Sequence, residues 1–503
     1  MKQGFDSKKY LKLQKAKIRE RIRLFDKLYI EFGGKLVDDN HAARVLPGYE
    51  PDLKIQLLQE LKDDLEVLLC INANDIEKSR VRADRMISYE VEVLRLIQFL
   101  RGKGIEVNSV VITLFDGQKK VEKFVERLKE YGIRPYIHTF TKGYPTDVET
   151  IVSEEGYGAN PYIETKKKIV VVSAPGACSG KLATSLSQLY HENKRGVKAG
   201  YAKFETFPVW DLPLKHPVNL AYEAATADID DKNMIDYFHL EKYGVTAVNY
   251  NRDLEVFPVV ASIMKKIFGK DYYFSPTDMG VNVIGKCIVD DEAVREAAKD
   301  EIVRRYLDGL VEVKKGVSEP VVAERLKLLM NEVGVSERER KVVAGAEEKA
   351  ASSKMPSACL AFAVDLLEGY DMIDNGEIDG EMVFVCGRKT GYLSPVASTI
   401  LNALKILTRI PDEVQLLAET VLEPVLGVKN EISNFRESYL NLSEVLMTLS
   451  ICSTTNPVAK MALANLEKLR GAELHGSYLI EDGEVRVLKN LGVRVTCDTG
   501  VEV

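Results

Sequence analysis

Residues 168–190 read KIVVVSAPGACSGKLATSLSQLY, and this stretch decides the fold. Residues 169–172 form an uninterrupted aliphatic run, which is typical of a strand buried on both faces of a parallel sheet. A turn of small residues follows, and Leu182, Leu186 and Leu189 then recur at helical spacing. The stretch therefore predicts a strand, a tight turn and a helix, an arrangement in which backbone N–H groups and a helix N-terminus face an anion.

The turn in this stretch is P-loop-like, because the phosphate-binding loop of NTPases reads G-x-x-x-x-G-K-[ST]. Gly180 and Lys181 fit this motif. Pro175 stands in place of its first glycine, and Leu182 in place of the hydroxyl residue that holds magnesium. The candidate phosphate ligands are Gly176, Ser179, Gly180, Lys181 and Thr184, and either Thr184 or Ser185 is a candidate to supply the missing hydroxyl. The other interpretation is a glycine-rich turn whose lysine is only solvated.

Length and charge limit the class of protein. A chain of 503 residues exceeds what one hydrophobic core supports, so we expect several domains. The net charge of −7 argues against broad binding to nucleic acid or to an anionic membrane surface. No apolar run reaches membrane-spanning length, and the first residues lack the apolar core of a signal peptide. These features predict a cytoplasmic protein.

Cysteine and histidine spacing gives no sign of a metal site. The seven cysteines include no C-x-x-C pair, and the six histidines include no H-E-x-x-H motif. A disulfide framework, a zinc ribbon and a zincin metalloprotease are therefore not indicated, and we expect no zinc site. Most of the cysteines lie in or beside aliphatic runs and are predicted to be core thiols.

Predicted strands and helices alternate from residue 51 to residue 140, which is typical of right-handed βαβ units in a parallel sheet. Asn72, Asn74 and Asp75 follow one of these strands. Ligands bind beyond the carboxyl ends of parallel strands, so these side chains and the Gly176–Lys181 turn are predicted to share one rim.

Further candidate ligands lie on both sides of the central stretch. Residues 33–35, Gly-Gly-Lys, form either a phosphate-contacting turn or a plain turn. Residues 201–220 mix aromatic residues with prolines, which predicts a long loop that lines a pocket or covers the sheet. Asp228 and Asp231 belong to an acidic cluster that suits magnesium or marks the start of a helix. Arg252 is a candidate phosphate ligand because its planar guanidinium group suits phosphate.

The pattern divides the chain into three regions. Residues 1–285 are predicted to form an N-terminal α/β region with the P-loop-like turn. Residues 286–351 form a helical segment, either an insert or an oligomerisation arm. Residues 352–503 form a separate C-terminal α/β domain, in which strand and helix patterns alternate again.

The C-terminal domain carries secondary candidates for anion binding. Arg388 and Lys389 lie among glycines directly behind a predicted strand, and the hydroxyls of Ser453 and Thr454 precede a predicted helix. Both groups suit an anion. A solvated turn explains Arg388 and Lys389 equally well, and helix capping explains the hydroxyls.

Five strings of the sequence are long enough to compare with a known family. They are EFGGKLVDDNHAARVLPGYEPD at residues 31–52, INANDIEK at 71–78, EGYGANPYIET at 155–165, SQLYHENKRGVKAGYAKFETFPVWDLPLKHPVNLAYEAATADIDD at 187–231, and SPTDMGVN at 275–282. They resemble a family of bacterial cytoplasmic proteins catalogued as a domain of unknown function, or as an uncharacterised protein family. The resemblance covers essentially the whole chain. It implies an α/β N-terminal part, a helical region and a C-terminal α/β domain, and it brings no established activity.

In members of that family the central turn tends to read PGPGSGK, and here Ala177 and Cys178 replace its second proline and second glycine. Some members carry the label ATP-dependent zinc protease. Because this sequence lacks the zinc motif, the label is not transferred to it.

Together these features predict an enzyme that binds a nucleotide or a phosphorylated metabolite at the Gly176–Lys181 turn, with magnesium held by Asp228 or Asp231. The alternative is a non-catalytic metabolite-binding or regulatory protein whose helical segment joins subunits. A third hypothesis places the chemistry around Gly387–Gly391. We expect a homo-oligomer without a nucleic-acid or membrane partner, and the sequence identifies neither substrate nor reaction.

Overall fold

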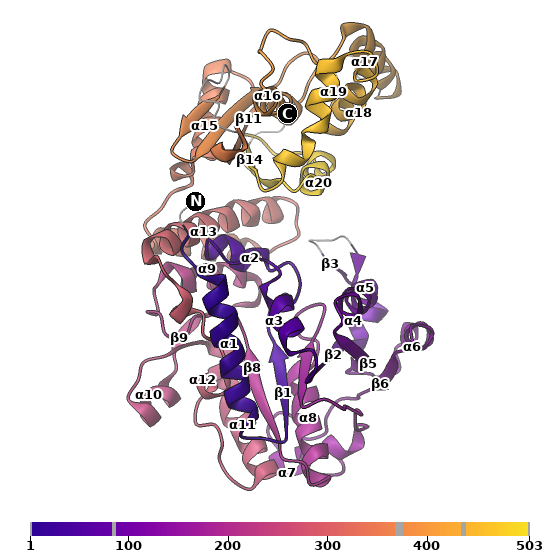
Figure 1. The fold of residues 1–503 in the computed structure, drawn as a ribbon, viewed down its shortest axis with the longest axis vertical. Helices are drawn as coiled ribbons and strands as arrows, with labels where there is room; N and C mark the ends of the chain where they lie inside the picture. Colours follow the sequence, from indigo (N-terminus) through magenta and orange to yellow (C-terminus); the bar gives the residue numbers. More distant parts are fainter. Residues whose placement is uncertain (1–2, 83–86, 368–375, 434–438, 501–503) are drawn as a thin grey trace. The chain divides into compact units, whose positions relative to one another are not determined.

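The computed structural model describes residues 3–82, 87–367, 376–433 and 439–500. The chain forms two compact units, one that ends at Ala298 and one that begins at Lys299, inside the predicted helical segment. Each unit has its own sheet (Figure 1). Each also has its own cluster of buried hydrophobic side chains. The predicted fold class, a parallel-sheet α/β region followed by a separate C-terminal α/β region, is confirmed.

A six-stranded parallel sheet organises the N-terminal unit, with the strand order β6-β5-β2-β7-β1-β8. The strands are β1 (Lys27–Phe32), β2 (Leu65–Asn72), β5 (Glu106–Thr113), β6 (Arg134–Ile137), β7 (Ile169–Ser173) and β8 (Ala199–Phe204). The aliphatic run quoted above is therefore β7, a strand with neighbours on both sides and with every residue buried.

Helices and two short hairpins complete this unit. They are α1 (Ser7–Ile22), α2 (Asn40–Val45), α3 (Leu53–Leu61), α4 (Ala73–Glu77), β3 (Val81–Arg82), β4 (Ile87–Ser88), α5 (Tyr89–Gly102), α6 (Lys120–Glu130), α7 (Val148–Ile151), α8 (Lys181–Lys194), α9 (Pro217–Ala225), β9 (Asn233–Ile235), α10 (Tyr237–Tyr243), β10 (Val248–Tyr250), α11 (Asn251–Phe268), α12 (Pro276–Met279) and α13 (Asp291–Lys314), the last of which continues past Ala298.

One face of the sheet packs against α8 and α11. Val170 and Val172 of β7 share a buried cluster with Leu186 and Leu189 of α8 and with Phe257 of α11. The helical leucine spacing seen in the sequence is thus the buried stripe of α8. Because this stripe fixes α8 on the sheet, the turn that joins β7 to α8 is fixed at both ends.

The strand order places a topological switch point at the carboxyl edge of the sheet. The chain runs from β2 through β5 to β6 at one edge, whereas from β7 it passes over β1 to β8 at the other edge. The connections that leave the adjacent strands β2 and β7 therefore run in opposite directions. In an open parallel sheet this is the topological switch point at which ligands bind.

The interpretation of residues 201–220 as one long loop is wrong at both ends. Tyr201 and Lys203 belong to β8, the edge strand, whose register pairs them with residues of β1. Pro217 begins α9, and the side chain of His216 caps that helix by accepting from Val218 N. A proline at the first helical position lacks only an N–H group that has no helical partner anyway. Here proline marked the start of a helix.

The C-terminal unit is built on a five-stranded mixed sheet with the strand order β12-β13-β11-β14-β15. Its strands are β11 (Ser357–Ala363), β12 (Glu377–Asp379), β13 (Met382–Arg388), β14 (Glu473–Gly476) and β15 (Arg494–Cys497). Its helices are α14 (Pro320–Glu332), α15 (Lys341–Ser353), α16 (Pro395–Leu407), α17 (Glu419–Ser433), α18 (Leu442–Cys452), α19 (Pro457–Ala464) and α20 (Asp482–Asn490). Leu360 of β11 and Val385 of β13 share a core with α16, whose N-terminus is capped by Ser394.

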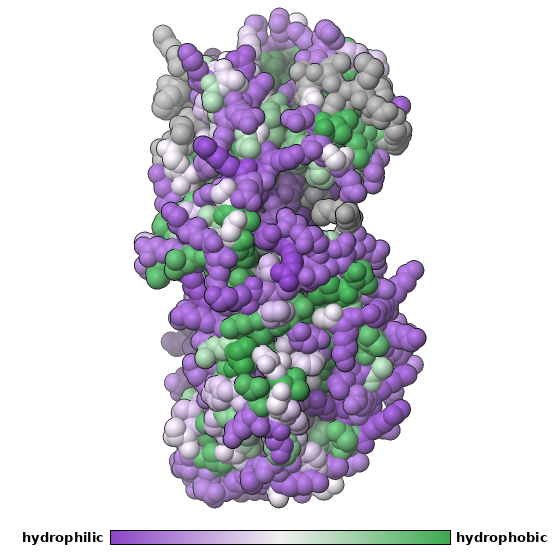
Figure 2. Space-filling view, turned by 90° about the vertical axis from the view of Figure 1, so that its left-hand side faces the viewer, coloured by the Kyte–Doolittle hydropathy of each residue, from purple (hydrophilic) through white to green (hydrophobic). Residues whose placement is uncertain are grey.

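Hydrophilic side chains cover much of the face drawn in Figure 2, and apolar side chains gather over part of the N-terminal unit on that face. In the part of the chain that the structure describes, no helix combines the length and the apolarity needed to cross a bilayer.

Candidate functional site

The Gly176–Lys181 turn lies at the carboxyl end of β7 and leads directly into α8. Cys178 and Gly180 have positive φ angles of 55° and 78°, and Ser179 Oγ donates to a carbonyl within the turn at 3.1 Å. Within the described residues, the backbone amides of residues 176–178 and of Gly180 donate to no protein acceptor. These amides are therefore available to an anion at the start of α8.

Two strand ends hold the turn in place. Thr113, the last residue of β5, donates from Oγ1 to Ser179 O at 2.9 Å, and Asn72, the last residue of β2, donates from Nδ2 to Cys178 O at 3.4 Å. A methyl group on Gly180 would lie 2.9 Å from Thr113 Cβ. The turn therefore lies at the switch point between β2 and β7. Asn72 lies at the same rim of the sheet, as predicted.

Tyr89 and Arg80 also lie at the turn, and neither was predicted. A methyl group on Gly176 would lie 2.5 Å from the Tyr89 hydroxyl, so the tyrosine packs directly against the backbone there. The Arg80 guanidinium lies 5.3 Å from the centre of the Tyr89 ring and 3.4 Å from an Asp75 carboxylate oxygen. Arg80 is thus a second cation close to the turn. No local motif marks it, because only the tertiary fold brings it there.

The Lys181 side chain faces β1, the strand beside β7. Its Nζ lies 4.0 Å from Glu31 Oε1, and the two side chains are 14% and 12% exposed. Tyr201 donates to the other oxygen of Glu31 at 2.8 Å, and the register of β1 and β8 pairs Glu31 with Lys203. Polar side chains from α8, β1 and β8 therefore adjoin at one edge. We term the following set the carboxyl-edge cluster: Glu31, Lys181, Tyr201, Lys203, Glu205, Tyr250 and Asp253.

Lys203 is the hub of the carboxyl-edge cluster. Its Nζ lies 3.1 Å from Glu205 Oε2 and also contacts the Asp253 carboxylate and the Tyr250 hydroxyl. Tyr250 in turn donates to Glu205 Oε1 at 3.2 Å. Burial alone lowers the pKa of Lys203, but the carboxylates of Asp253 and Glu205 outweigh it and hold that pKa well above its ordinary value. Lys203 is therefore a fixed positive charge.

Glu205 is the member of this cluster that titrates near neutral pH. Burial raises its pKa from 4.5 to about 7, because the opposing effect of Lys203 is offset by repulsion from Asp253 and Glu31. A quarter of the side chain, 25%, remains exposed. A methyl group on Gly33 would lie 2.5 Å from Glu205 Cγ, so the glycine turn after β1 makes room for this carboxyl group. A partly exposed group of this kind can donate and accept a proton at neutral pH.

Comparison with known proteins identifies the family. Residues 3–334 match the family described as "Domain of unknown function DUF1846, N-terminal", and residues 338–502 match its C-terminal counterpart. The chain belongs to the DUF1846 family. This confirms the resemblance to an uncharacterised bacterial family that the sequence strings carry.

Relatives of this chain occur in Clostridium botulinum, each named "UPF0371 protein". Those of strain Alaska E43 (type E3) and strain Eklund 17B (type B) are both 50% identical to this chain over 503 residues. The protein of strain Langeland (type F) is 49% identical over the same length. Each comparison covers 99% of this chain and 98% of the relative. The names bring no activity with them.

Several predicted ligands of this DUF1846 protein face protein groups. Thr184 is buried, and its Oγ1 accepts from Cys70 Sγ at 3.6 Å. Both Asp231 oxygens accept from the Arg252 guanidinium, one of them at 2.8 Å from Nη2. Tyr222 also donates to Asp231, at 3.1 Å. Arg252 and Asp231 are thus paired with each other.

Asp228 lies exposed in the short 3-10 helix Ala227–Ile229. Among the residues that the structure describes, no group of three or more His, Cys, Asp or Glu side chains is placed to hold a metal ion.

The secondary candidates of the C-terminal unit are spread over different elements. Arg388 ends β13, and Lys389 Nζ lies 4.7 Å from the centre of the Tyr439 ring. Ser453 and Thr454 donate their hydroxyls to carbonyls in the last turn of α18, whereas Asn456 caps α19. The hydroxyls of Ser453 and Thr454 therefore bond to the C-terminal turn of α18.

Proposed function

We propose that this protein is an enzyme that anchors a phosphorylated small molecule or a nucleotide by its phosphate at the Gly176–Lys181 turn. The observation that carries the proposal is the set of turn amides with no acceptor among the described protein groups, at the switch point of a parallel sheet. Lys181 adds a full positive charge at the same place. Oriented amides and a helix N-terminus together favour a phosphate group.

We further propose that Glu205 transfers a proton to or from the anchored molecule. Its pKa of about 7 suits proton transfer at neutral pH. The turn follows β7 and Glu205 follows β8, so one strand, β1, separates them. Two strand spacings amount to about 10 Å. A phosphorylated small molecule spans that distance, with its phosphate at Lys181 and its reacting group near Glu205.

Magnesium enters this proposal with the nucleotide, as the counter-ion of its phosphates. Asp231 is occupied by Arg252 and Tyr222, so neutralisation of the bound phosphate falls to Lys181 and the turn amides. Arg80, beside Tyr89, is a further cation close to the turn.

A thermal-shift titration tests the anchor. Inorganic phosphate, ATP, GTP and a nucleotide sugar are added, with and without magnesium, to the wild type, to Lys181→Ala and to Lys194→Ala. Lys194→Ala is the matched control, because this substitution removes one positive charge from the far end of the same helix. We expect at least one ligand to stabilise the wild type and Lys194→Ala and to lose roughly tenfold in affinity with Lys181→Ala. Equal stabilisation of all three proteins, or of none, would end the proposal.

A non-catalytic metabolite-binding protein is the second candidate. It is favoured because the positive charges of the carboxyl-edge cluster already have negative partners within the cluster. Glu31 lies close to Lys181, and two carboxylates contact Lys203. Phosphorus NMR of the ligand found by titration distinguishes the two functions. An enzyme converts that ligand during prolonged incubation, and Glu205→Gln binds it without converting it. A ligand that survives unchanged with the wild type establishes the non-catalytic function.

A further inference from the structure

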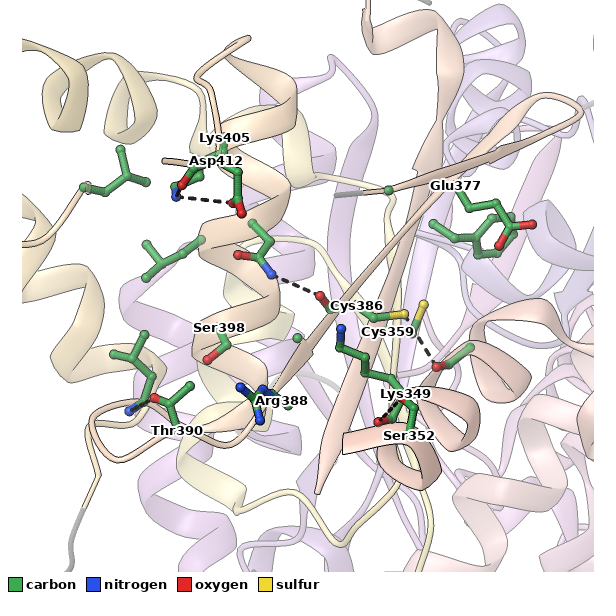
Figure 3. Close-up of a pocket in the computed structure, with 18 of the residues that line it drawn as sticks. Lys349, Ser352, Cys359, Glu377, Cys386, Arg388, Thr390, Ser398, Lys405 and Asp412 are labelled. Atoms are coloured by element: carbon green, nitrogen blue, oxygen red, sulfur yellow. Dashed lines mark hydrogen bonds and ion pairs between the residues drawn. The ribbon is translucent and has the colours of Figure 1, made fainter. Parts of the chain in front are cut away.

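The C-terminal unit contains a cavity of about 1160 Å³ beside β13 (Figure 3). Strand β12 pairs only with Met382–Phe384, so within the described residues the outer edge of β13 beyond Phe384 has no strand partner. Residues of α15 line the cavity from one side, and residues of α16 line it from the other. An open strand edge between two helices thus forms a hollow that side chains leave unfilled.

Two cations line this cavity without a carboxylate partner among the described residues, Lys349 of α15 and Arg388 of β13. Lys349 lies near the Cys386 thiol, whose pKa is lowered by the hydrogen bond from Cys359 and by the charge of this lysine. Guanidinium and ammonium groups that point into a cavity without a counter-charge favour an anionic ligand.

Ser398 provides a second, independent sign of a ligand. Its side chain lines the cavity and is only 8% exposed, and its Oγ has no hydrogen-bond partner. A methyl group on Gly387 would lie 2.8 Å from the Ser398 carbonyl carbon, so β13 touches α16 here and Arg388 follows directly. A buried hydroxyl left without a partner costs roughly 1–3 kcal/mol. A ligand oxygen beside Arg388 and Ser398 would remove that cost.

The other charges of the cavity restrict the kind of anion. Glu377 lies well away from Arg388 in Figure 3, and Lys405 is occupied by Asp412 at 3.5 Å. Two further glutamates, Glu348 and Glu419, also line the cavity. A polyanion spread through the cavity would meet these carboxylates. Because Glu377 lies well away from Arg388, a single anionic group at Arg388 does not meet that carboxylate.

The remaining wall is largely apolar. It includes Leu401 of α16 and, beyond that helix, Leu416 and Leu417, all of which belong to the hydrophobic core of this unit. A ligand body that lies against these side chains is therefore uncharged and apolar.

We propose that this cavity is a second ligand site, separate from the turn after β7, which takes an amphiphilic organic anion. One phosphate or carboxylate group lies between Arg388 and Ser398, and an uncharged apolar body lies along the leucines. The site goes beyond the proposed phosphate anchor because it uses a different unit and a different class of ligand.

Isothermal titration with octyl phosphate, octanoate, inorganic phosphate and ATP tests the site in the full-length protein. The variants are Arg388→Gln, Ser398→Ala and the matched control Lys389→Gln, which removes the adjacent positive charge but does not line the cavity. We expect octyl phosphate or octanoate to bind the wild type, Lys389→Gln and Lys181→Ala equally. With Arg388→Gln the affinity should fall roughly tenfold or more. Whichever amphiphile binds identifies the anionic group.

Alkylation of Cys386 provides a readout that does not depend on variants of the binding residues. In a Cys178→Ser background, which removes the exposed cysteine, the bound amphiphile should slow alkylation of Cys386 inside the cavity. The proposal is overturned if neither amphiphile binds at millimolar concentration, if Arg388→Gln binds as the wild type does, or if Cys386 is not protected. ATP binding more tightly than octyl phosphate in an Arg388-dependent manner would overturn the class of ligand.

Discussion

The Lys203 ammonium lies 3.1 Å from the Glu205 carboxylate, and the same ammonium also contacts Asp253. One cation is thus shared by two acids. Because Glu205 is buried, and because Asp253 and Glu31 repel a further negative charge, the proton on Glu205 is held to a higher pH than in an exposed glutamate. This relationship makes the stability of the N-terminal unit depend on pH.

Glu205→Gln should remove that dependence. The pKa of Glu205 is raised from 4.5 to about 7, so the folded state keeps a proton that the unfolded state has lost. The stabilisation is fully present below pH 4.5 and is lost as the pH rises through about 7. Glutamine stays neutral throughout. The stability of Glu205→Gln relative to the wild type should therefore increase by about 1–3 kcal/mol between pH 5 and pH 8.

Urea denaturation at the two pH values measures this difference, with Glu149→Gln on α7 as the control at an exposed glutamate. The same change in both variants, or a decrease for Glu205→Gln, would show that Glu205 does not titrate near neutral pH.

Gly180 and Gly196 test how tightly the turn is held. Both have φ angles in the left-handed region, 78° and 77°. A methyl group on Gly180 would meet Thr113 at 2.9 Å, whereas one on Gly196 would meet no atom within 4 Å. Alanine at either position adds the strain of a positive φ angle, which is about 1–2 kcal/mol. Only Gly180→Ala adds the collision, so it should be less stable than Gly196→Ala by about 1–3 kcal/mol in chemical denaturation. Equal loss from both would mean that the turn moves freely away from Thr113.

The pairing of Arg252 with Asp231 predicts a structural role for both. The Asp231 side chain is 1% exposed, so Arg252→Ala leaves a buried carboxylate without its main partner. We expect a loss of about 3–5 kcal/mol for Arg252→Ala and a much smaller loss for Arg252→Ala combined with Asp231→Asn. A double-mutant cycle from denaturation curves measures the coupling. Additive effects would show that the two residues act independently and would leave Arg252 available to a ligand.

Local patterns predicted the elements of the N-terminal sheet that are buried on both faces. The uninterrupted aliphatic run indicated the buried strand β7, and the helical spacing of leucines indicated α8. Both elements appear where expected. The edge strand β8 was missed because its residues mix aromatic and charged side chains, and because the prolines that follow it suggested irregular chain. Although β8 is almost entirely buried, it contains no uninterrupted aliphatic run, so its pattern alone did not mark it as a strand.

The candidate site was predicted only in part, for a related reason. The turn carries its own motif, but Glu205 and Arg80 acquire their positions from strands and hairpins far along the chain. The raised pKa of Glu205 arises from burial and from repulsion by Asp253 and Glu31, which outweigh Lys203, and no sequence spacing links Glu31 and Asp253 to Glu205. The Arg388 cavity likewise depends on where β12 stops pairing with β13.

Glu31→Gln should strengthen phosphate binding at the turn. Glu31 lies 4.0 Å from Lys181 Nζ and competes with an incoming anion for that charge. At this separation two unit charges interact by about 1 kcal/mol in water and by about 4 kcal/mol at an effective dielectric constant near 20. Glutamine removes the charge but keeps an oxygen that accepts from Tyr201, so the fold of the edge is preserved. We expect roughly fivefold to tenfold tighter binding of inorganic phosphate by isothermal titration, with no gain for Glu154→Gln, a control acid at the far end of α8. Unchanged or weaker binding to Glu31→Gln would mean that Lys181 does not meet the anion, and the phosphate anchor would have to lie elsewhere.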